Sequence, residues 1–176
     1  MDKLRQAIAA VPGFPKPGIV FRDITPVLAD AALLRQAVEA LAAPFRGQGV
    51  QLVVGAEARG FIFGPAVALE LGAGFVPVRK PGKLPRETQQ ATYKLEYGTD
   101  TLEMHCDAIA PGTRVLLVDD LLATGGTMEA CCTLADAAEA VVVGCAFLIE
   151  LAFLGGRERL APRQVVSLVT YASEDE

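Results

Sequence analysis

Three residue types are absent or scarce in this sequence of 176 residues, and each narrows the possible chemistry. Tryptophan is absent, and the only histidine, His105, has no partner in any pattern, so we assign it no role. The cysteines lack CxxC spacing, which argues against a zinc cage or a disulfide framework. They are Cys106, Cys131, Cys132 and Cys145. We interpret them as buried thiols of a reducing compartment, with a redox or metal role as the lesser alternative.

Long apolar runs and an excess of positive charge are also missing. The longest apolar run, residues 140–149, is too short to cross a bilayer, and the segment Met1–Arg5 lacks the apolar stretch of a secretory signal. The formal net charge is −5, whereas a protein that binds polyanions is normally basic. We therefore expect a soluble, cytoplasmic protein with neither a membrane nor a nucleic-acid partner.

Apolar residues make up 52% of the chain and occur in short runs that alternate with helix-period segments. This alternation is typical of βα units around a mainly parallel sheet. We expect a single domain over residues 1–176, with a doubly wound α/β sheet and helices on both faces. The predicted strands are 52–54, 75–78, 114–118, 141–149 and 165–171. The predicted helices are 61–71, 127–139 and one that Asp30 caps and that ends near Pro44.

Two segments interrupt this alternation. Residues 12–30, which we call the hood, contain four prolines, too many for a helix, and predict a structured loop region. Residues 80–106 begin with a basic stretch that contains proline and glycine, and continue with alternating apolar residues around a turn at 98–100. This second pattern predicts a mobile loop that runs into a β-hairpin.

Most of the chemical information lies in residues 115–128, which read Val-Leu-Leu-Val-Asp-Asp-Leu-Leu-Ala-Thr-Gly-Gly-Thr-Met. A buried strand ends in two acids, and a short loop then opens a helix. In a parallel α/β sheet, ligands bind beyond the carboxyl ends of the strands. The loop consists of Ala123, Thr124, Gly125, Gly126 and Thr127. Its glycines let backbone N–H groups approach a phosphate, its threonines add hydroxyls, and the helix N-terminus favours negative charge.

The two carboxylates beside this loop indicate a sugar phosphate rather than a phosphate alone. Asp119 and Asp120 accept hydrogen bonds, so they suit two neighbouring hydroxyl groups. The stretch lacks the lysine of an ATP-binding P-loop. The order of residues therefore predicts ribose hydroxyls at Asp119 and Asp120, and a 5′-phosphate at residues 123–127.

This string resembles the phosphoribosyl-pyrophosphate motif of type I phosphoribosyltransferases. The wording Asp-Asp-Leu-Leu-Ala-Thr-Gly-Gly-Thr is similar to that of the members of this family that use adenine. The resemblance covers nearly the whole chain. It implies that the protein joins adenine to phosphoribosyl pyrophosphate, giving AMP and pyrophosphate, with Asp120 among the catalytic residues. It also implies a homodimer and Mg²⁺ that arrives with the pyrophosphate-bearing substrate.

The resemblance further assigns residues to the leaving pyrophosphate. Residues 55–61 match the family's pyrophosphate loop, in which Glu57, Ala58 and Arg59 would contact substrate, with a non-proline cis peptide at Glu57–Ala58. The basic stretch 79–86 matches the family's flexible loop. Its pyrophosphate-contacting positions would be Arg79, Lys80 and Lys83.

Two further segments match positions that handle the purine. Residues 93–98 resemble the hairpin edge that folds over the active site, where Glu96 would serve as general acid or base and Tyr97 would contact substrate. Residues 20–26 resemble the family's hood segment. There Phe21 would stack on the purine, and backbone groups of Val20 and Arg22 would read its amino edge.

Two alternatives remain at this stage. The first is the same fold acting on xanthine, hypoxanthine or a pyrimidine, which the hood segment distinguishes. The second is a non-catalytic regulator that senses phosphoribosyl pyrophosphate. That role requires a DNA-reading element, and the chain has no basic helix-turn-helix extension.

Overall fold

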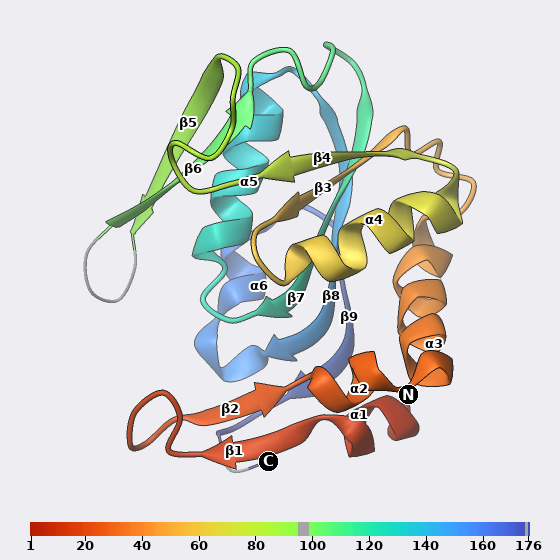
Figure 1. The fold of residues 1–176 in the computed structure, drawn as a ribbon, viewed down its shortest axis with the longest axis vertical. Coiled ribbons are helices and arrows are strands. Elements are labelled where there is room, and N and C mark those ends of the chain that lie inside the picture. The colour runs from red at the N-terminus through yellow and green to blue at the C-terminus, as the bar shows by residue number, and fades with distance from the viewer. Residues whose placement is uncertain (95–98, 175) are drawn as a thin grey trace.

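A five-stranded parallel sheet forms the centre of the computed structural model, which describes residues 1–94, 99–174 and 176 (Figure 1). Its strands lie in the order β4-β3-β7-β8-β9. They are β3 (Leu52–Ala56), β4 (Gly74–Val78), β7 (Arg114–Leu122), β8 (Val141–Leu151) and β9 (Val165–Tyr171). All five strands predicted from the sequence are thereby confirmed. β7 extends beyond its predicted end at residue 118, because it stays paired with β8 as far as Leu122 and Glu150.

Helices cover both faces of this sheet, as the doubly wound prediction requires. α3 (Ala31–Ala42) and α4 (Gly60–Leu71) lie on one side, and α5 (Gly126–Ala137) lies on the other (Figure 1). Alternate residues of β7 point to opposite cores: Val115 and Leu117 pack on the α5 side, whereas Leu116 and Val118 pack on the α3 and α4 side. Both faces of the strand are apolar for this reason, as expected of a strand buried between two helical layers.

The helix boundaries follow local signals in the sequence. The Asp30 carboxylate caps α3, accepting hydrogen bonds from the backbone N–H groups of Ala32 at 2.8 Å and Leu33 at 3.0 Å. α4 ends at Gly72, whose φ of 67° lies in the left-handed region that glycine adopts readily. Three short helical segments also connect elements of this part of the chain: η1 (Ala43–Phe45), η2 (Ala152–Leu154) and α6 (Gly156–Arg159). None of the helices within the described part of the chain is long and apolar enough to cross a membrane.

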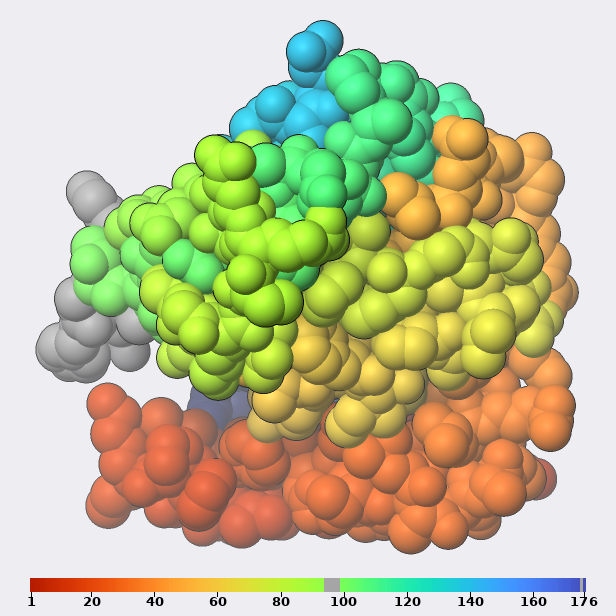
Figure 2. Space-filling model, turned by 45° about the horizontal axis from the view of Figure 1, so that its top comes forward, coloured from red at the N-terminus to blue at the C-terminus, as the bar shows by residue number. Residues whose placement is uncertain are grey.

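The N-terminal region has more regular structure than the sequence predicted. α1 (Asp2–Ala7) precedes an antiparallel pair, β1 (Ala9–Pro12) and β2 (Val20–Asp23), and α2 (Thr25–Ala29) follows. The prediction of a helix-free hood was wrong at α2, because Pro26 occupies the first turn, where a missing N–H costs nothing. Figure 2 shows this region as a layer of its own below the body of the molecule, with a hollow on one side between the two.

The hairpin predicted within residues 80–106 is present. β5 (Thr88–Lys94) pairs antiparallel with β6 (Thr99–His105) and packs against α5. The turn that joins them lies outside the described residues, and the mobility of the preceding loop stays a prediction. Of the four cysteines, Cys131, Cys132 and Cys145 are buried, as expected, whereas Cys106 is exposed because it lies just beyond the end of β6.

Candidate active site

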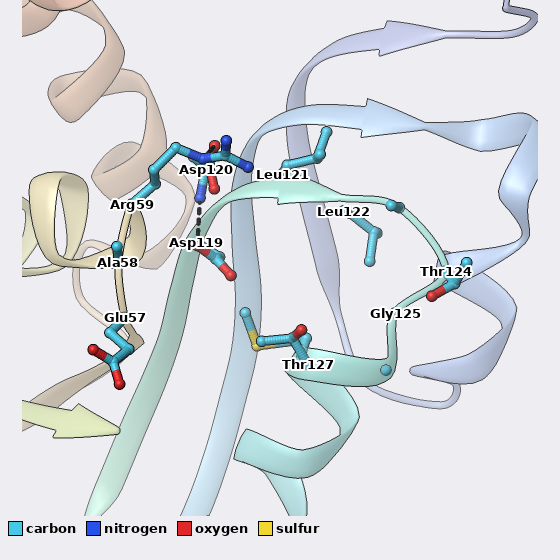
Figure 3. Close-up of a pocket in the computed structure, with 13 residues that line it drawn as sticks. Glu57, Ala58, Arg59, Asp119, Asp120, Leu121, Leu122, Thr124, Gly125 and Thr127 are labelled. Atoms are coloured by element: carbon cyan, nitrogen blue, oxygen red, sulfur yellow. Dashed lines mark hydrogen bonds and ion pairs between the residues drawn. The ribbon is translucent and has the colours of Figure 1, made fainter. Parts of the chain in front are cut away.

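The strand order creates a switch point, between the carboxyl ends of β3 and β7, where a ligand pocket is expected. In sequence the five parallel strands run β3, β4, β7, β8, β9, so the chain moves outward from β3 to β4 and then returns to start β7 on the other side of β3. Ligands bind at such a switch point, beyond the carboxyl ends of the two diverging strands. A pocket of about 340 Å³ lies there, lined by residues 57–59, which follow β3, and residues 119–128, from the end of β7 to the start of α5 (Figure 3).

The phosphate loop, residues 123–127, is built as the sequence predicted. It leaves β7 at Leu122 and enters α5 at Gly126, so the N-terminus of α5 opens into the pocket. Gly125 has φ +81°, a conformation that residues with side chains rarely adopt. All five predicted loop residues line the pocket. Backbone N–H groups at a helix start, together with two hydroxyls, are the donors that an anion-binding site requires.

The side chains of Asp119 and Asp120, which lie near the end of β7, point in different directions. The Asp119 side chain points into the pocket, whereas Asp120 turns toward Arg59 (Figure 3). Asp119 Oδ1 accepts a hydrogen bond from the Asp120 backbone N–H at 2.9 Å. Burial raises the pKa of Asp119 well above its ordinary value, and the adjacent Asp120 carboxylate raises it further. Burial also raises the pKa of Asp120, although the Arg59 guanidinium opposes the shift. Asp119 and Asp120 are therefore two adjacent, poorly solvated acids whose charge Arg59 offsets only in part.

Arg59 connects this acidic pair to the hood. Its Nε lies 2.5 Å from Asp120 Oδ2, and its guanidinium lies 5.5 Å from the centre of the Phe21 ring. The peptide bond Glu57–Ala58 just before it is cis, as the family resemblance implied. The predicted pyrophosphate loop and the predicted base-stacking residue are thus brought to the same side of the pocket.

The three predicted cations of the basic stretch lie at the rim, outside the pocket lining, and the side chains of two of them pair with Glu57. Glu57 Oε2 lies 2.9 Å from Lys83 Nζ and 3.2 Å from Arg79 Nη2, while its Oε1 accepts a hydrogen bond from the Lys80 backbone N–H at 2.5 Å. Burial alone would raise the pKa of Glu57, but these donors outweigh it and lower the pKa. The Lys80 side chain instead reaches Asp100, with Nζ 3.1 Å from Oδ2.

The hood presents backbone groups along the edge of β2 that faces away from β1. Gly13 N–H donates to the Ile19 carbonyl at 2.8 Å. Opposite residues in an antiparallel pair alternate between hydrogen-bonded and non-hydrogen-bonded. Since the Gly13–Ile19 pair is hydrogen-bonded, the backbone N–H and C=O groups of Val20 and Arg22 point away from β1. At that edge Val20 N–H donates to Glu174 Oε1 at 2.6 Å. The Arg22 side chain lies over the Tyr171 ring, 4.0 Å from its centre, so only its backbone faces this edge.

Glu96 and Tyr97, predicted to act on the purine, lie outside the described residues. Sequence reasoning missed other residues of the site. Leu121, Leu122 and Met128 line the pocket, although they belong to the string that identified it. Tyr93 was also missed: its hydroxyl lies 3.4 Å from Thr127 Oγ1 and ties the hairpin to the phosphate loop. Across the residues with described positions, no group of three or more His, Cys, Asp or Glu side chains could hold a metal.

Comparisons with known proteins agree with this geometry. A model of the phosphoribosyl transferase domain matches residues 28–170, so the chain belongs to the phosphoribosyltransferases. Adenine phosphoribosyltransferase of Methylococcus capsulatus is 58% identical over 171 residues, 97% of this chain and 100% of the relative. That of Rhodopirellula baltica is 55% identical over 172 residues, 98% of this chain and 84% of the relative. Within the larger class, the chain is a member of the adenine phosphoribosyltransferase family.

Solved structures of the same family share the fold. Adenine phosphoribosyltransferase from Thermoanaerobacter pseudethanolicus superposes with a TM-score of 0.94 at 49% identity, covering 97% of this chain and 99% of that one. The Saccharomyces cerevisiae enzyme, in a complex that contains adenine, has a TM-score of 0.90 at 42% identity, covering 95% and 97%. The doubly wound fold and the family resemblance inferred from the sequence are both confirmed.

Proposed function

We propose that the pocket between β3 and β7 transfers the phosphoribosyl group of phosphoribosyl pyrophosphate to adenine, releasing AMP and pyrophosphate. The observation that carries this proposal is the phosphate loop, with Asp119 and Asp120 separated from it by two residues, at the switch point of the sheet. Related solved structures support it. One contains adenine, and the adenine phosphoribosyltransferase of Trypanosoma brucei contains AMP, pyrophosphate and ribose 5-phosphate.

In this proposal the donor lies along the pocket. Residues 123–127 bind its 5′-phosphate through N–H groups and hydroxyls, and Asp119 accepts hydrogen bonds from the ribose hydroxyls. Asp120 shares that role once Arg59 moves toward the leaving pyrophosphate. The ribose hydroxyls would add hydrogen-bond donors to these two poorly solvated carboxylates. As the bond to pyrophosphate breaks, these carboxylates also lie close to a ribose ring that becomes positive.

The leaving pyrophosphate is assigned to Arg59, Arg79, Lys80 and Lys83. Arg79 and Lys83 already pair with the Glu57 carboxylate at the pocket rim. When pyrophosphate binds, its oxygens replace that carboxylate as the partner of the two cations. Ala58, which lines the pocket between Glu57 and Arg59, offers its backbone at the same place. Closure of the loop over the substrate would exclude water from the reacting carbon.

Mg²⁺ fits this site as a companion of the substrate. The carboxylate oxygens of Asp119 and Asp120 are donors that Mg²⁺ accepts, and Mg²⁺ commonly binds through one or two carboxylates together with substrate phosphates. When bound, it would neutralise charge on the pyrophosphate. The protein side chains still position the ribose and the leaving group.

The base is assigned to the hood. Phe21 stacks on the purine, and the open edge of β2 reads it: the Val20 carbonyl accepts from the amino group, while the Arg22 N–H donates to the neighbouring ring nitrogen. A site of this kind rejects a 6-oxo purine, which presents the opposite pattern. Glu96 takes the proton that the purine loses as its ring nitrogen bonds to ribose, and Tyr97 contacts the substrate.

The active form in this proposal is a cytoplasmic homodimer of single-domain chains. The surface of α4 supports a dimer, because this helix carries apolar residues on its solvent-exposed side as well as on its buried side. Ile62 is 38% exposed and Leu69 is 83% exposed, and they lie two turns apart on one stripe. Such a stripe is suited to burial against a second copy.

The decisive test offers purified protein phosphoribosyl pyrophosphate and Mg²⁺ with adenine, hypoxanthine, guanine, xanthine or uracil in parallel. Nucleotide formation with adenine alone is expected. Turnover with another base instead would keep the donor site and discard the assignment of Val20, Phe21 and Arg22. Folded protein that binds the donor but converts none of the five bases would favour the sensing regulator.

A further inference from the structure

The turn that follows β8 packs against the outer side of the phosphate loop. Figure 1 shows α6 beside the loop that enters α5. A Cβ atom on Gly156 would overlap the Ala123 carbonyl oxygen and lie 3.1 Å from Gly125 N. A Cβ atom on Gly125 would lie 2.8 Å from the Gly156 carbonyl oxygen. The two segments therefore meet backbone to backbone, and this approach requires glycine on both sides.

Arg159, three residues after Gly156, joins the loop to the helix that it enters. Its Nη1 donates a hydrogen bond to the Thr124 carbonyl at 3.3 Å. Its Nε lies 3.4 Å from Glu129 Oε2, in the first turn of α5. Arg159 does not line the pocket. Its contact with the loop is to the main chain, from outside the pocket lining.

The geometry of a peptide unit gives this contact a consequence. The Thr124–Gly125 peptide is trans, so its C=O and its N–H point in opposite directions. A donor that holds the Thr124 carbonyl therefore also sets the orientation of the Gly125 N–H, because both groups belong to one rigid peptide unit. The positive charge behind the peptide also polarises it, which strengthens the N–H as a donor to an anion.

We propose that Arg159, seated by Gly156, is a positioning residue that sets the phosphate loop in its anion-binding conformation before substrate arrives. The inference rests on the assignment of residues 123–127 to the 5′-phosphate. The neighbouring arginines are engaged elsewhere. Arg157 pairs with Glu150 on β8, with Nη2 2.5 Å from Oε2, and Arg163 pairs with Asp136 near the far end of α5.

These neighbours supply a matched control. Arg163→Ala removes an equally charged side chain and an ion pair to the same helix, without touching the loop. We would compare Arg159→Ala, Arg159→Lys and Arg163→Ala with the unaltered protein. The readouts are binding of ribose 5-phosphate by calorimetry, KM for phosphoribosyl pyrophosphate, KM for adenine, kcat and Tm.

Arg159→Ala is expected to weaken ribose 5-phosphate binding and raise KM for phosphoribosyl pyrophosphate about tenfold, as loss of one charge-assisted hydrogen bond would. KM for adenine and Tm stay unchanged, Arg159→Lys recovers part of the loss, and Arg163→Ala resembles the unaltered protein. Unchanged ribose 5-phosphate binding in folded Arg159→Ala would overturn the proposal. A fall in Tm with equal rises in both KM values would reduce Arg159 to a structural role.

The binding experiment keeps the two proposals apart. If the unaltered protein binds ribose 5-phosphate but makes no AMP, the proposed function fails, while the comparison of variants still decides the role of Arg159. If the unaltered protein binds no ribose 5-phosphate, the assignment of the loop fails, and the role of Arg159 fails with it. As a second variant, folded Gly156→Ala is expected to lose more ribose 5-phosphate affinity than Arg159→Ala, because its methyl group displaces the loop directly.

Discussion

Replacing Asp119 by asparagine is expected to lower activity while stabilising the ligand-free fold. Asparagine keeps the shape of the side chain and the acceptor that the Asp120 N–H uses, but it removes the charge offered to the ribose. A hydrogen bond to a charged group contributes about 1.5–3 kcal/mol, and about 1.4 kcal/mol corresponds to a tenfold change in an equilibrium or rate ratio. The expected loss in kcat/KM for phosphoribosyl pyrophosphate is therefore about tenfold to 150-fold.

The stability effect follows from the direction of the pKa shift. The pKa of Asp119 is raised in the folded protein by burial and by the Asp120 carboxylate. The folded state therefore binds the proton more tightly than the unfolded chain, whose aspartate pKa is about 3.9. Consequently the free energy of unfolding falls as pH rises through the window between these two pKa values, and the penalty persists at higher pH. Asparagine has no such penalty, so the variant gains stability relative to the unaltered protein above that window.

Urea unfolding at several pH values, combined with steady-state kinetics, tests both parts. The control is Asp107→Asn, since Asp107 is an exposed residue that pairs with Arg86 away from the pocket. We expect the control to match the unaltered protein in kcat/KM. Near-normal kcat/KM in Asp119→Asn would refute the ribose assignment. A variant that is less stable at neutral pH than the unaltered protein would refute the claim that the buried charge is costly.

Four further outcomes follow from the same geometry. Lys83→Ala removes a cation assigned to the pyrophosphate and leaves the Glu57 carboxylate with fewer donors, so KM for phosphoribosyl pyrophosphate should rise on the order of tenfold. An unchanged KM would remove Lys83 from the pyrophosphate site. Deleting residues 172–176 removes the Glu174 contact to Val20 and should raise KM for adenine about three- to tenfold without altering KM for the donor. Leu69→Glu should shift the protein toward monomer in sedimentation velocity, whereas Phe153→Glu, an exposed apolar site off α4, should not. Chelating Mg²⁺ should abolish AMP formation while leaving Tm unchanged, and a lower Tm would indicate a metal bound by the protein itself.

The parts of the fold predicted best from the sequence depend on neighbouring residues. The apolar runs marked all five strands of the sheet, and Asp30 marked the start of α3. The phosphate loop was recognisable because an apolar strand, two carboxylates and a loop rich in threonine and glycine follow one another within residues 115–128. The hood was harder. The four prolines predicted a loop region, which residues 13–19 are, but they indicated neither β2 nor a helix with Pro26 in its first turn.

Contacts between distant segments account for what the sequence did not predict. Residues 57–59 and 119–128 form one pocket only because β3 and β7 are neighbours in the sheet. Nothing local indicated that Glu57 would gather Arg79 and Lys83, or that Arg159 would hold the Thr124 carbonyl. The sequence by itself determined the local elements and the chemistry of the phosphate loop, since torsion preferences and hydrophobic periodicity act over a few residues. Only the tertiary structure decided which charges meet, because burial and ion pairing depend on how the strands are ordered and packed.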